Sequence, residues 1–243
     1  MNTTPNDLIE ALPRSDRRRL LAISEPVYLV LSEILCEPTD AIQHVYFPTD
    51  GFISLITPMA GHLGLEVGMV GREGMVGAHL ALGVAASPLR ALVQGSGAAW
   101  RVPAADFRIE LARSAALQRG LNRYVYVLMA QLATSAACQR FHPIGPRLAR
   151  RLLMSQDRAA ADTFHVTQEF LAYMLGVRRV GVTAAASAMH RSGLIEYKRG
   201  ELTVLDRPGL EAAACSCYHA DQQSYAAVLG NSIGAPDQRC ASA

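Results

Sequence analysis

The sequence is poor in several features that mark other classes of protein. It contains one tryptophan among 243 residues, and Lys198 is the only lysine among its 23 basic residues. No apolar run near its start is long enough for a signal peptide or a membrane span. We therefore expect a cytoplasmic protein that makes no contact with a membrane.

The cysteines do not resemble a disulfide framework. They are five in number, which is odd, and they are scattered along the chain. Small disulfide-bonded scaffolds use even sets at regular spacing, so we expect reduced thiols at Cys36, Cys138, Cys215, Cys217 and Cys240. The sequence also has no P-loop, zinc-hydrolase helix or nucleophile elbow. These absences predict a protein that is not an enzyme and has no catalytic residues.

The most informative pattern lies between residues 165 and 206. Thr167 is a good N-cap for a short helix, in which apolar residues from Phe170 to Leu175 recur at helical spacing. Gly176 ends this helix, and a second periodic run continues from Arg178 to Gly193. Two short helices joined by a tight glycine turn form a helix-turn-helix, whose second helix can enter the DNA major groove.

Two β-prone segments, LIEYK and ELTVLD, follow these helices and meet at Arg199-Gly200. They predict a hairpin, which in this position is the wing of a winged helix. Residues 147–207 hold ten Lys or Arg against six Asp or Glu, a net charge of +4, whereas residues 1–146 are neutral. The positive excess therefore lies in the segment expected to face a phosphate backbone.

The first half of the chain shows a different sequence pattern. Half of all residues in the chain are apolar, which suffices for one or two hydrophobic cores. A short helix is predicted over residues 5–24. Brief β-prone pieces separated by Gly, Pro and Asp then predict an antiparallel barrel or jelly-roll-like sandwich. These pieces are VYLVLSEI, HVYFP, GFISLITP, LEVGMVG, LRALVQG and AAWRVP.

A long helix is predicted from about Asp106 to Cys138. Its apolar residues step by four, three and four positions, the heptad rhythm of a helix–helix seam. The predicted homodimer interface is Leu121, Tyr124, Val125, Leu128 and Leu132; the alternative is that this stripe only covers its own barrel. HPIGP (142–146) interrupts the helix and predicts a hinge. The predicted domains are residues 1–112, 113–142 and 143–243.

This order of barrel, long helix, hinge and winged helix resembles the Crp/Fnr family of bacterial transcription regulators. The resemblance is strongest over TQEFLAYMLGVRRVGVT, RSGLIEYKRGELTVLD and VYFPTDGFISL. It implies an α+β fold: an N-terminal antiparallel β-roll of the cyclic-nucleotide-binding type, a long central dimerisation helix and a C-terminal winged helix-turn-helix. It also implies a homodimer that binds double-stranded DNA under the control of an effector in the roll.

The resemblance also indicates which residues contact DNA. Family members often carry a Glu and two Arg at the front of the second helix; here Arg179 matches one Arg, while Val180 and Ala184 replace the others. Because a bidentate Arg–guanine pair is the commonest specific contact, we expect Arg179 to read a base, with Arg178 next. The full predicted set is Thr167, Gln168, Arg178, Arg179, Val180, Thr183, Lys198 and Arg199.

The effector site of the family transfers poorly. Members that bind cyclic nucleotides have a Gly-Glu pair and an Arg-Ser or Arg-Thr pair, where this chain has Gly77-Ala78 and Arg90-Ala91. A buried phosphate needs several donors, so cyclic AMP is not the expected effector. The predicted pocket residues are Glu66, Gly74, Met75, Val76, Gly77, Arg90 and Ala91.

Other cofactors are not expected. An iron–sulfur cluster of the family type needs four cysteines, with several near the N-terminus, where Cys36 is alone, and no histidine spacing favours haem. Cys215, Cys217 and His219 could offer soft ligands, but no second pair is evident, so no metal is predicted. Two alternatives stay open. One is an enzyme or a thiol- or metal-dependent protein that uses these three residues and docks through the winged helix; the other is a regulator whose roll binds no ligand and contacts RNA polymerase.

Overall fold

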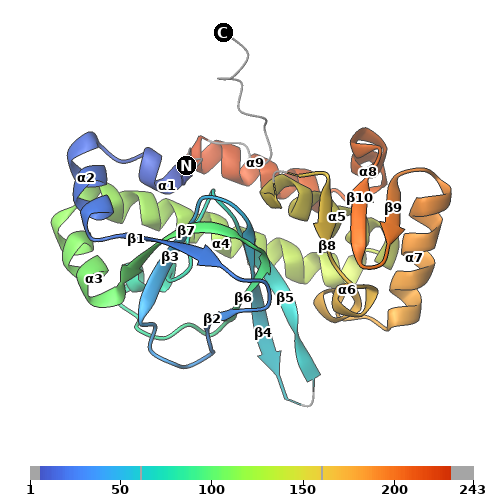
Figure 1. Ribbon diagram of the computed structural model, residues 1–243, viewed down its shortest axis with the longest axis horizontal. Helices are drawn as coiled ribbons and strands as arrows, with labels where there is room; N and C mark the ends of the chain where they lie inside the picture. Colours follow the sequence, from blue (N-terminus) through green and yellow to red (C-terminus); the bar gives the residue numbers. More distant parts are fainter. Residues whose placement is uncertain (1–5, 61, 160, 231–243) are drawn as a thin grey trace, which may run out of the picture.

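The computed structural model describes residues 6–60, 62–159 and 161–230. A roll of short strands forms the middle of the molecule, with small helices at one end and the winged helix at the other (Figure 1). The long helix α4 (Ala115–Phe141) runs across the molecule between these ends. Within the described part of the chain, no helix combines the length and apolar character needed to cross a bilayer.

The roll consists of two antiparallel sheets. The first has the order β1-β7-β3 and the second β2-β6-β4-β5. Their strands are β1 (Glu25–Leu29), β2 (Ile34–Cys36), β3 (His44–Pro48), β4 (Phe52–Met59), β5 (His62–Val70), β6 (Arg90–Gly95) and β7 (Gly97–Pro103). The short helix η1 (Ala78–Leu82) lies between β5 and β6 along the chain. The predicted antiparallel roll is confirmed.

Two predicted elements of this half are each divided in the structure. The helix expected over residues 5–24 is two helices, α1 (Asp7–Glu10) and α2 (Arg14–Ala22), because Pro13 stands between them as the N-cap of α2. The strand expected over VYLVLSEI is β1 and β2, separated by a turn in which Ser32 has a φ of 68°. A left-handed residue cannot continue a strand, so the chain turns there.

The long helix predicted from Asp106 is also two helices. α3 (Ala104–Arg113) ends at Ser114, whose extended backbone breaks the helix. The Ser114 hydroxyl then caps α4 by accepting a hydrogen bond from the backbone N–H of Leu117 (3.0 Å) and donates one to Asp16 (2.6 Å). A serine cap satisfies a backbone donor that has no partner in the helix, which is why the break falls at this residue.

The predicted hinge is shorter than HPIGP. Only His142 and Pro143 separate α4 from α5 (Ile144–Ala159), because Pro146 lies in the first turn of α5, where its missing N–H costs nothing. The winged helix then contains β8 (Thr163–His165), α6 (Gln168–Leu175), α7 (Arg179–Arg191), β9 (Ile195–Lys198) and β10 (Glu201–Val204). The three strands form one sheet of order β8-β10-β9.

The tail after the wing folds back onto the rest of the molecule. It forms α8 (Arg207–Ala213) and α9 (Cys217–Leu229), and α9 packs along α4. Tyr225 of α9 is part of the roll core, whereas Tyr218 belongs to the core of the winged helix. Phe52 and Met69 of the roll join that second core as well, so the roll and the winged helix are packed directly against each other.

Candidate nucleic-acid interface

The helix-turn-helix is built as its sequence predicts. Thr167 caps α6, its hydroxyl accepting a hydrogen bond from the Phe170 N–H at 3.1 Å. Gly176 ends α6 with a φ of 61°, a left-handed conformation that suits glycine. α7 follows after two residues and buries Val182, Ala186 and Met189 against the domain core. The opposite face of α7 is left to solvent.

The exposed N-terminal end of α7 carries the residues expected to read DNA. Arg178 is the N-cap of α7 and Arg179 its first residue, and both side chains are exposed. Neither pairs with a carboxylate among the described residues. Val180 beside them is 73% exposed. Two unpaired guanidinium groups and an apolar side chain at a helix end suit contacts with guanine edges and a thymine methyl group.

Three further residues of this prediction, Thr167, Gln168 and Thr183, already form hydrogen bonds within the protein. Thr167 acts as a cap, and the Thr183 hydroxyl donates to the side-chain oxygen of Gln168 at 2.7 Å. This bond joins the start of α6 to the exposed face of α7. Thr183 and Gln168 therefore stabilise the angle between the two helices, and their contact with DNA stays a prediction.

The wing ends in a tight two-residue turn. Arg199 and Gly200 have φ values of 51° and 87°, as a two-residue hairpin turn of this kind requires. A Cβ atom at Gly200 would lie 2.8 Å from the His165 ring, so glycine is needed there for space as well. Tyr197 donates to the carbonyl of Val166 at 2.6 Å, which fixes the wing beside the start of α6.

The charge argument from the sequence needs correction. Five of the ten basic residues in the segment 147–207 are buried or form ion pairs within the protein. They are Arg147, Arg150, Arg151, Arg158 and Arg207. The basic residues left exposed are Arg178, Arg179, Arg191, Lys198 and Arg199. Lys198 forms a surface pair with Glu196 at 2.6 Å but keeps a 77% exposed side chain. Apart from Arg191 at the far end of α7, the exposed basic residues therefore lie at the start of α7 and at the wing tip.

A cavity of about 260 Å³ lies between the roll and α4. Four of the seven residues predicted for the effector pocket line it. Met75, Val76, Gly77 and Ala91 line it, and the rest of its wall is mainly apolar. His79 also lines it, and its buried Nε2 has no partner among the described groups. Burial lowers the pKa of this imidazole.

Glu66, Gly74 and Arg90 lie outside this cavity, and their role in an effector pocket stays a prediction. Glu66 pairs with Arg151 of α5 and accepts a hydrogen bond from Ser54. Gly74 packs against α4, where a Cβ would lie 2.3 Å from the Tyr124 hydroxyl. Arg90 forms a part-exposed ion pair with Glu37 at 2.9 Å. Local sequence could not show these contacts, because each joins segments far apart in the chain.

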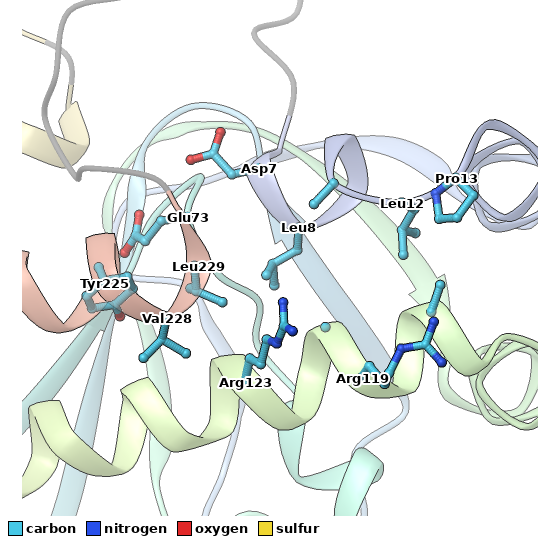
Figure 2. A pocket seen from close by; sticks show the side chains of 13 residues that line it. Asp7, Leu8, Leu12, Pro13, Glu73, Arg119, Arg123, Tyr225, Val228 and Leu229 are labelled. Atoms are coloured by element: carbon cyan, nitrogen blue, oxygen red, sulfur yellow. The ribbon is translucent and has the colours of Figure 1, made fainter.

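A second cavity, of about 290 Å³, lies between α1, the first half of α4 and the end of α9. Figure 2 shows Arg119 and Arg123 of α4 on one side of it and Val228 and Leu229 on another. None of the predicted effector residues lines this cavity. It was not foreseen from the sequence, because α9 was not predicted to return to this part of α4.

The stripe proposed as a dimer seam is divided between two faces of α4. Leu121 and Tyr124 are buried in their own chain, with 1% and 0% of their surface exposed, and so have no surface to offer a partner. Val125, Leu128 and Leu132 are partly buried. The large apolar residues that α4 leaves exposed are Tyr126 and Met129, at 62% and 63%, and Phe141 at its C-terminal end. The exposed apolar residues Tyr126 and Met129 thus each follow directly after a residue of the predicted seam, Val125 and Leu128.

The cysteine cluster also differs from its prediction. Cys215 and Cys217 come together with Cys138 and His142, not with His219, which is exposed. The hydrogen bond between the Cys138 and Cys215 thiols lowers the pKa of Cys215 to about 5, and it raises that of Cys138. Cys36, Cys138, Cys215 and Cys217 are free thiols; Cys240 lies outside the described residues. The alternative that rests on Cys215, Cys217 and His219 has no shared site in this structure.

Comparison with known proteins agrees with the geometry. The family model for the Crp-like helix-turn-helix domain matches residues 146–213. This chain carries a Crp-like helix-turn-helix domain on the fold of Crp/Fnr regulators. No curated protein matches it. Most of the chain is similar in structure to a putative Crp/Fnr-family transcriptional regulator from Eubacterium rectale, with 15% identity, a TM-score of 0.65 and coverage of 85% of this chain and 96% of the other.

Two further solved structures give the same fold. The c-di-GMP-responsive global regulator CLP of Xanthomonas campestris is 15% identical, with a TM-score of 0.64 over 80% of this chain and all of its own. FixK2 of Bradyrhizobium japonicum is 12% identical, with a TM-score of 0.65 over 80% of this chain and 98% of its own. The α+β fold of roll, central helix and winged helix-turn-helix is therefore confirmed.

Proposed function

We propose that this protein is a homodimeric, sequence-specific DNA-binding transcription regulator that acts in the cytoplasm and not as an enzyme. The observation that carries this proposal is the exposed, unpaired pair Arg178 and Arg179 at the start of α7, beside a basic wing tip on a Crp-like domain. Arg179 reads a guanine edge, Arg178 supports it, and Val180 contacts a thymine methyl group. Lys198 and Arg199 contact phosphates.

This division of roles is testable with one pair of variants. An operator is first selected from a random pool of duplex DNA with the wild-type protein. Arg179→Ala should weaken binding to that operator by roughly 5- to 150-fold, the equivalent of 1–3 kcal/mol, and leave binding to random DNA nearly unchanged. Lys198→Ala should weaken binding to both DNAs alike and reduce the salt dependence by about one counterion. Fluorescence anisotropy measures both effects.

Arg191→Ala is the matched control, because Arg191 is also exposed on α7 but lies at its other end. It should bind the operator as the wild type does. Equal losses on operator and random DNA for Arg179→Ala would contradict base reading by this residue.

The roll cavity supports an effector that is small and largely apolar. Its walls include His79, whose buried Nε2 has no hydrogen-bond partner among the described residues, and no described arginine lines it. Arg90, the residue aligned with the phosphate-binding arginine, is paired with Glu37 outside it. These features argue against cyclic AMP, since a phosphate needs charged and hydrogen-bonding partners. Native mass spectrometry of the purified protein tests whether a small molecule stays bound, and loss of that molecule from a His79→Leu variant would assign it to this cavity.

Dimerisation through α4 is part of the proposal. A winged helix reads two-fold symmetric sites as a pair, and the apolar face with Val125, Leu128, Leu132, Tyr126 and Met129 supports the contact. Contact of the roll with RNA polymerase and the domain limits at residues 112 and 142 stay predictions.

A further inference from the structure

Four side chains from three distant parts of the chain meet where α4 ends. Cys138 lies in the last turn of α4, and His142 is the residue that ends this helix. Cys215 lies between α8 and α9, and Cys217 is the first residue of α9. Their sulfur and ring nitrogen atoms all lie within 4.8 Å of one another. The function proposed above makes no use of this cluster.

The spacing suits a four-coordinate metal ion. In a tetrahedral zinc site, with Zn–S bonds of about 2.3 Å and Zn–N bonds of about 2.0 Å, neighbouring ligand atoms are roughly 3.5–3.8 Å apart. The Sγ atoms of Cys138 and Cys215 are 3.5 Å apart, and so are Cys217 Sγ and His142 Nδ1. The site needs only a small contraction of its longer separations to bring all four ligands onto one ion.

The type of ligand favours zinc over other cations. Three thiols and one imidazole form a soft donor set without oxygen, which excludes calcium and magnesium. Four protein ligands leave no open position, as in structural zinc sites. The thiols of Cys138, Cys215 and Cys217 are 2–8% exposed and form a cluster separate from both hydrophobic cores.

The surroundings compensate the charge of such a site. Three thiolates around Zn²⁺ carry a net negative charge. The guanidinium groups of Arg147 and Arg150 interact electrostatically with Cys138 and Cys215. Cys217 also lies in the first turn of α9, where the helix dipole favours negative charge.

We propose that Cys138, His142, Cys215 and Cys217 bind one Zn²⁺ ion in a closed structural site. The ion joins the end of α4 and the two-residue connection to α5 with the loop between α8 and α9. Because His142 lies in that connection, the ion restrains the hinge between the central helix and the winged helix. A disulfide between Cys138 and Cys215 is the competing arrangement, and it would require the two sulfurs to close from 3.5 Å to about 2.05 Å.

Metal content of the full chain tests this proposal directly. Protein purified without chelators, with its thiols kept reduced, should contain about one zinc per chain by inductively coupled plasma mass spectrometry. After removal of zinc, Co²⁺ should give the absorption spectrum of a tetrahedral thiolate site. Protein that contains no zinc as purified and takes up neither Zn²⁺ nor Co²⁺ would overturn the proposal, as would a Cys138–Cys215 disulfide in this reduced material.

Single substitutions assign the ligands. Cys138→Ser and Cys215→Ser should each weaken zinc binding, measured by competition with a chromogenic chelator, by more than the roughly 10–100-fold cost of losing an outer-shell partner. Cys36→Ser and His219→Ala should bind zinc as the wild type does, since neither residue belongs to the cluster. Unchanged affinity in Cys138→Ser, or a loss in His219→Ala equal to that in Cys215→Ser, would refute the assignment. Circular dichroism shows whether each variant is folded; if a ligand variant is not, the wild-type titration decides.

Discussion

At the scale of single residues, the protonation of the buried His79 affects the stability of the fold. Burial among apolar groups lowers the pKa of its imidazole from 6.5, although a hydrogen bond with the backbone of Ala85 opposes this shift. The neutral form is therefore the one that the folded protein prefers. In the unfolded chain the ring accepts a proton more readily.

The sign of the effect on stability follows. Above pH 6.5, His79 does not reduce the free energy of unfolding, because the ring is neutral in both states. As the pH falls from 6.5 through the lower pKa of the folded state, the unfolded chain binds the proton more readily, and the free energy of unfolding decreases. We expect the free energy of unfolding of His79→Gln to fall less than that of the wild type between pH 7.5 and pH 5.5, in urea titrations at both values. The exposed His219→Gln variant serves as the control. If wild type and His79→Gln lose stability in parallel, His79 is not the group responsible.

At the scale of elements, α4 serves different neighbours on its different faces. Leu121, Tyr124 and Val127 pack on the roll, and Ser135 and Cys138 face α5 and the tail. Tyr126 and Met129 remain on the outside. A helix with an apolar face that its own chain leaves uncovered is suited to pairing with a second copy.

A charge on that face should disrupt the dimer. Met129→Glu would bury a carboxylate in the proposed seam without changing a core residue, so we expect a monomer in analytical ultracentrifugation where the wild type sediments as a dimer. Ile109→Glu is the matched control, because Ile109 is 51% exposed on α3 and outside the seam. A dimer that survives Met129→Glu would rule out this face.

At the scale of the whole molecule, buried ion pairs join the roll to the winged helix. Arg158 of α5 pairs with Glu73 of the roll at 2.8 Å, and both side chains are at most 4% exposed. Burial alone would lower the pKa of Arg158, but the attraction of Glu73 more than offsets it, and the pKa is raised. Arg158 thus keeps its charge inside the protein, and its pair with Glu73 joins α5 to the roll.

Removing one partner should be costly. Glu73→Gln leaves the Arg158 guanidinium buried without a counter-charge, and such a loss costs roughly 3–5 kcal/mol. The measurement is the free energy of unfolding from guanidinium titration. Glu10→Gln breaks the surface pair with Arg17, whose side chain is 30% exposed, and should cost less than about 1 kcal/mol. Equal losses in the two variants would show that the buried pair stabilises the fold no more than the surface pair does.

The order of helices and strands was determined by the sequence alone, because it depends on local patterns. The cap at Thr167, the turn at Gly176 and the hairpin at Arg199-Gly200 each act over a few residues. The exposure of Arg178 and Arg179 follows from the same local pattern. Both residues lie at the start of α7, outside the apolar face of this helix that is buried in the domain core. These features carry the proposed DNA contact.

Only the tertiary structure decided which distant residues meet. Cys138 and Cys215 are 77 positions apart, and Glu73 and Arg158 are 85 apart. Their pairing depends on how α5 and α9 pack against the rest of the protein, and the periodicity of apolar residues in the sequence does not show that packing. The same packing buries or pairs five arginines that the sequence count had assigned to the DNA-facing surface. It also places Arg90 outside the roll cavity, in an ion pair with Glu37. Local chemistry determined the elements, and the close packing of those elements determined the sites.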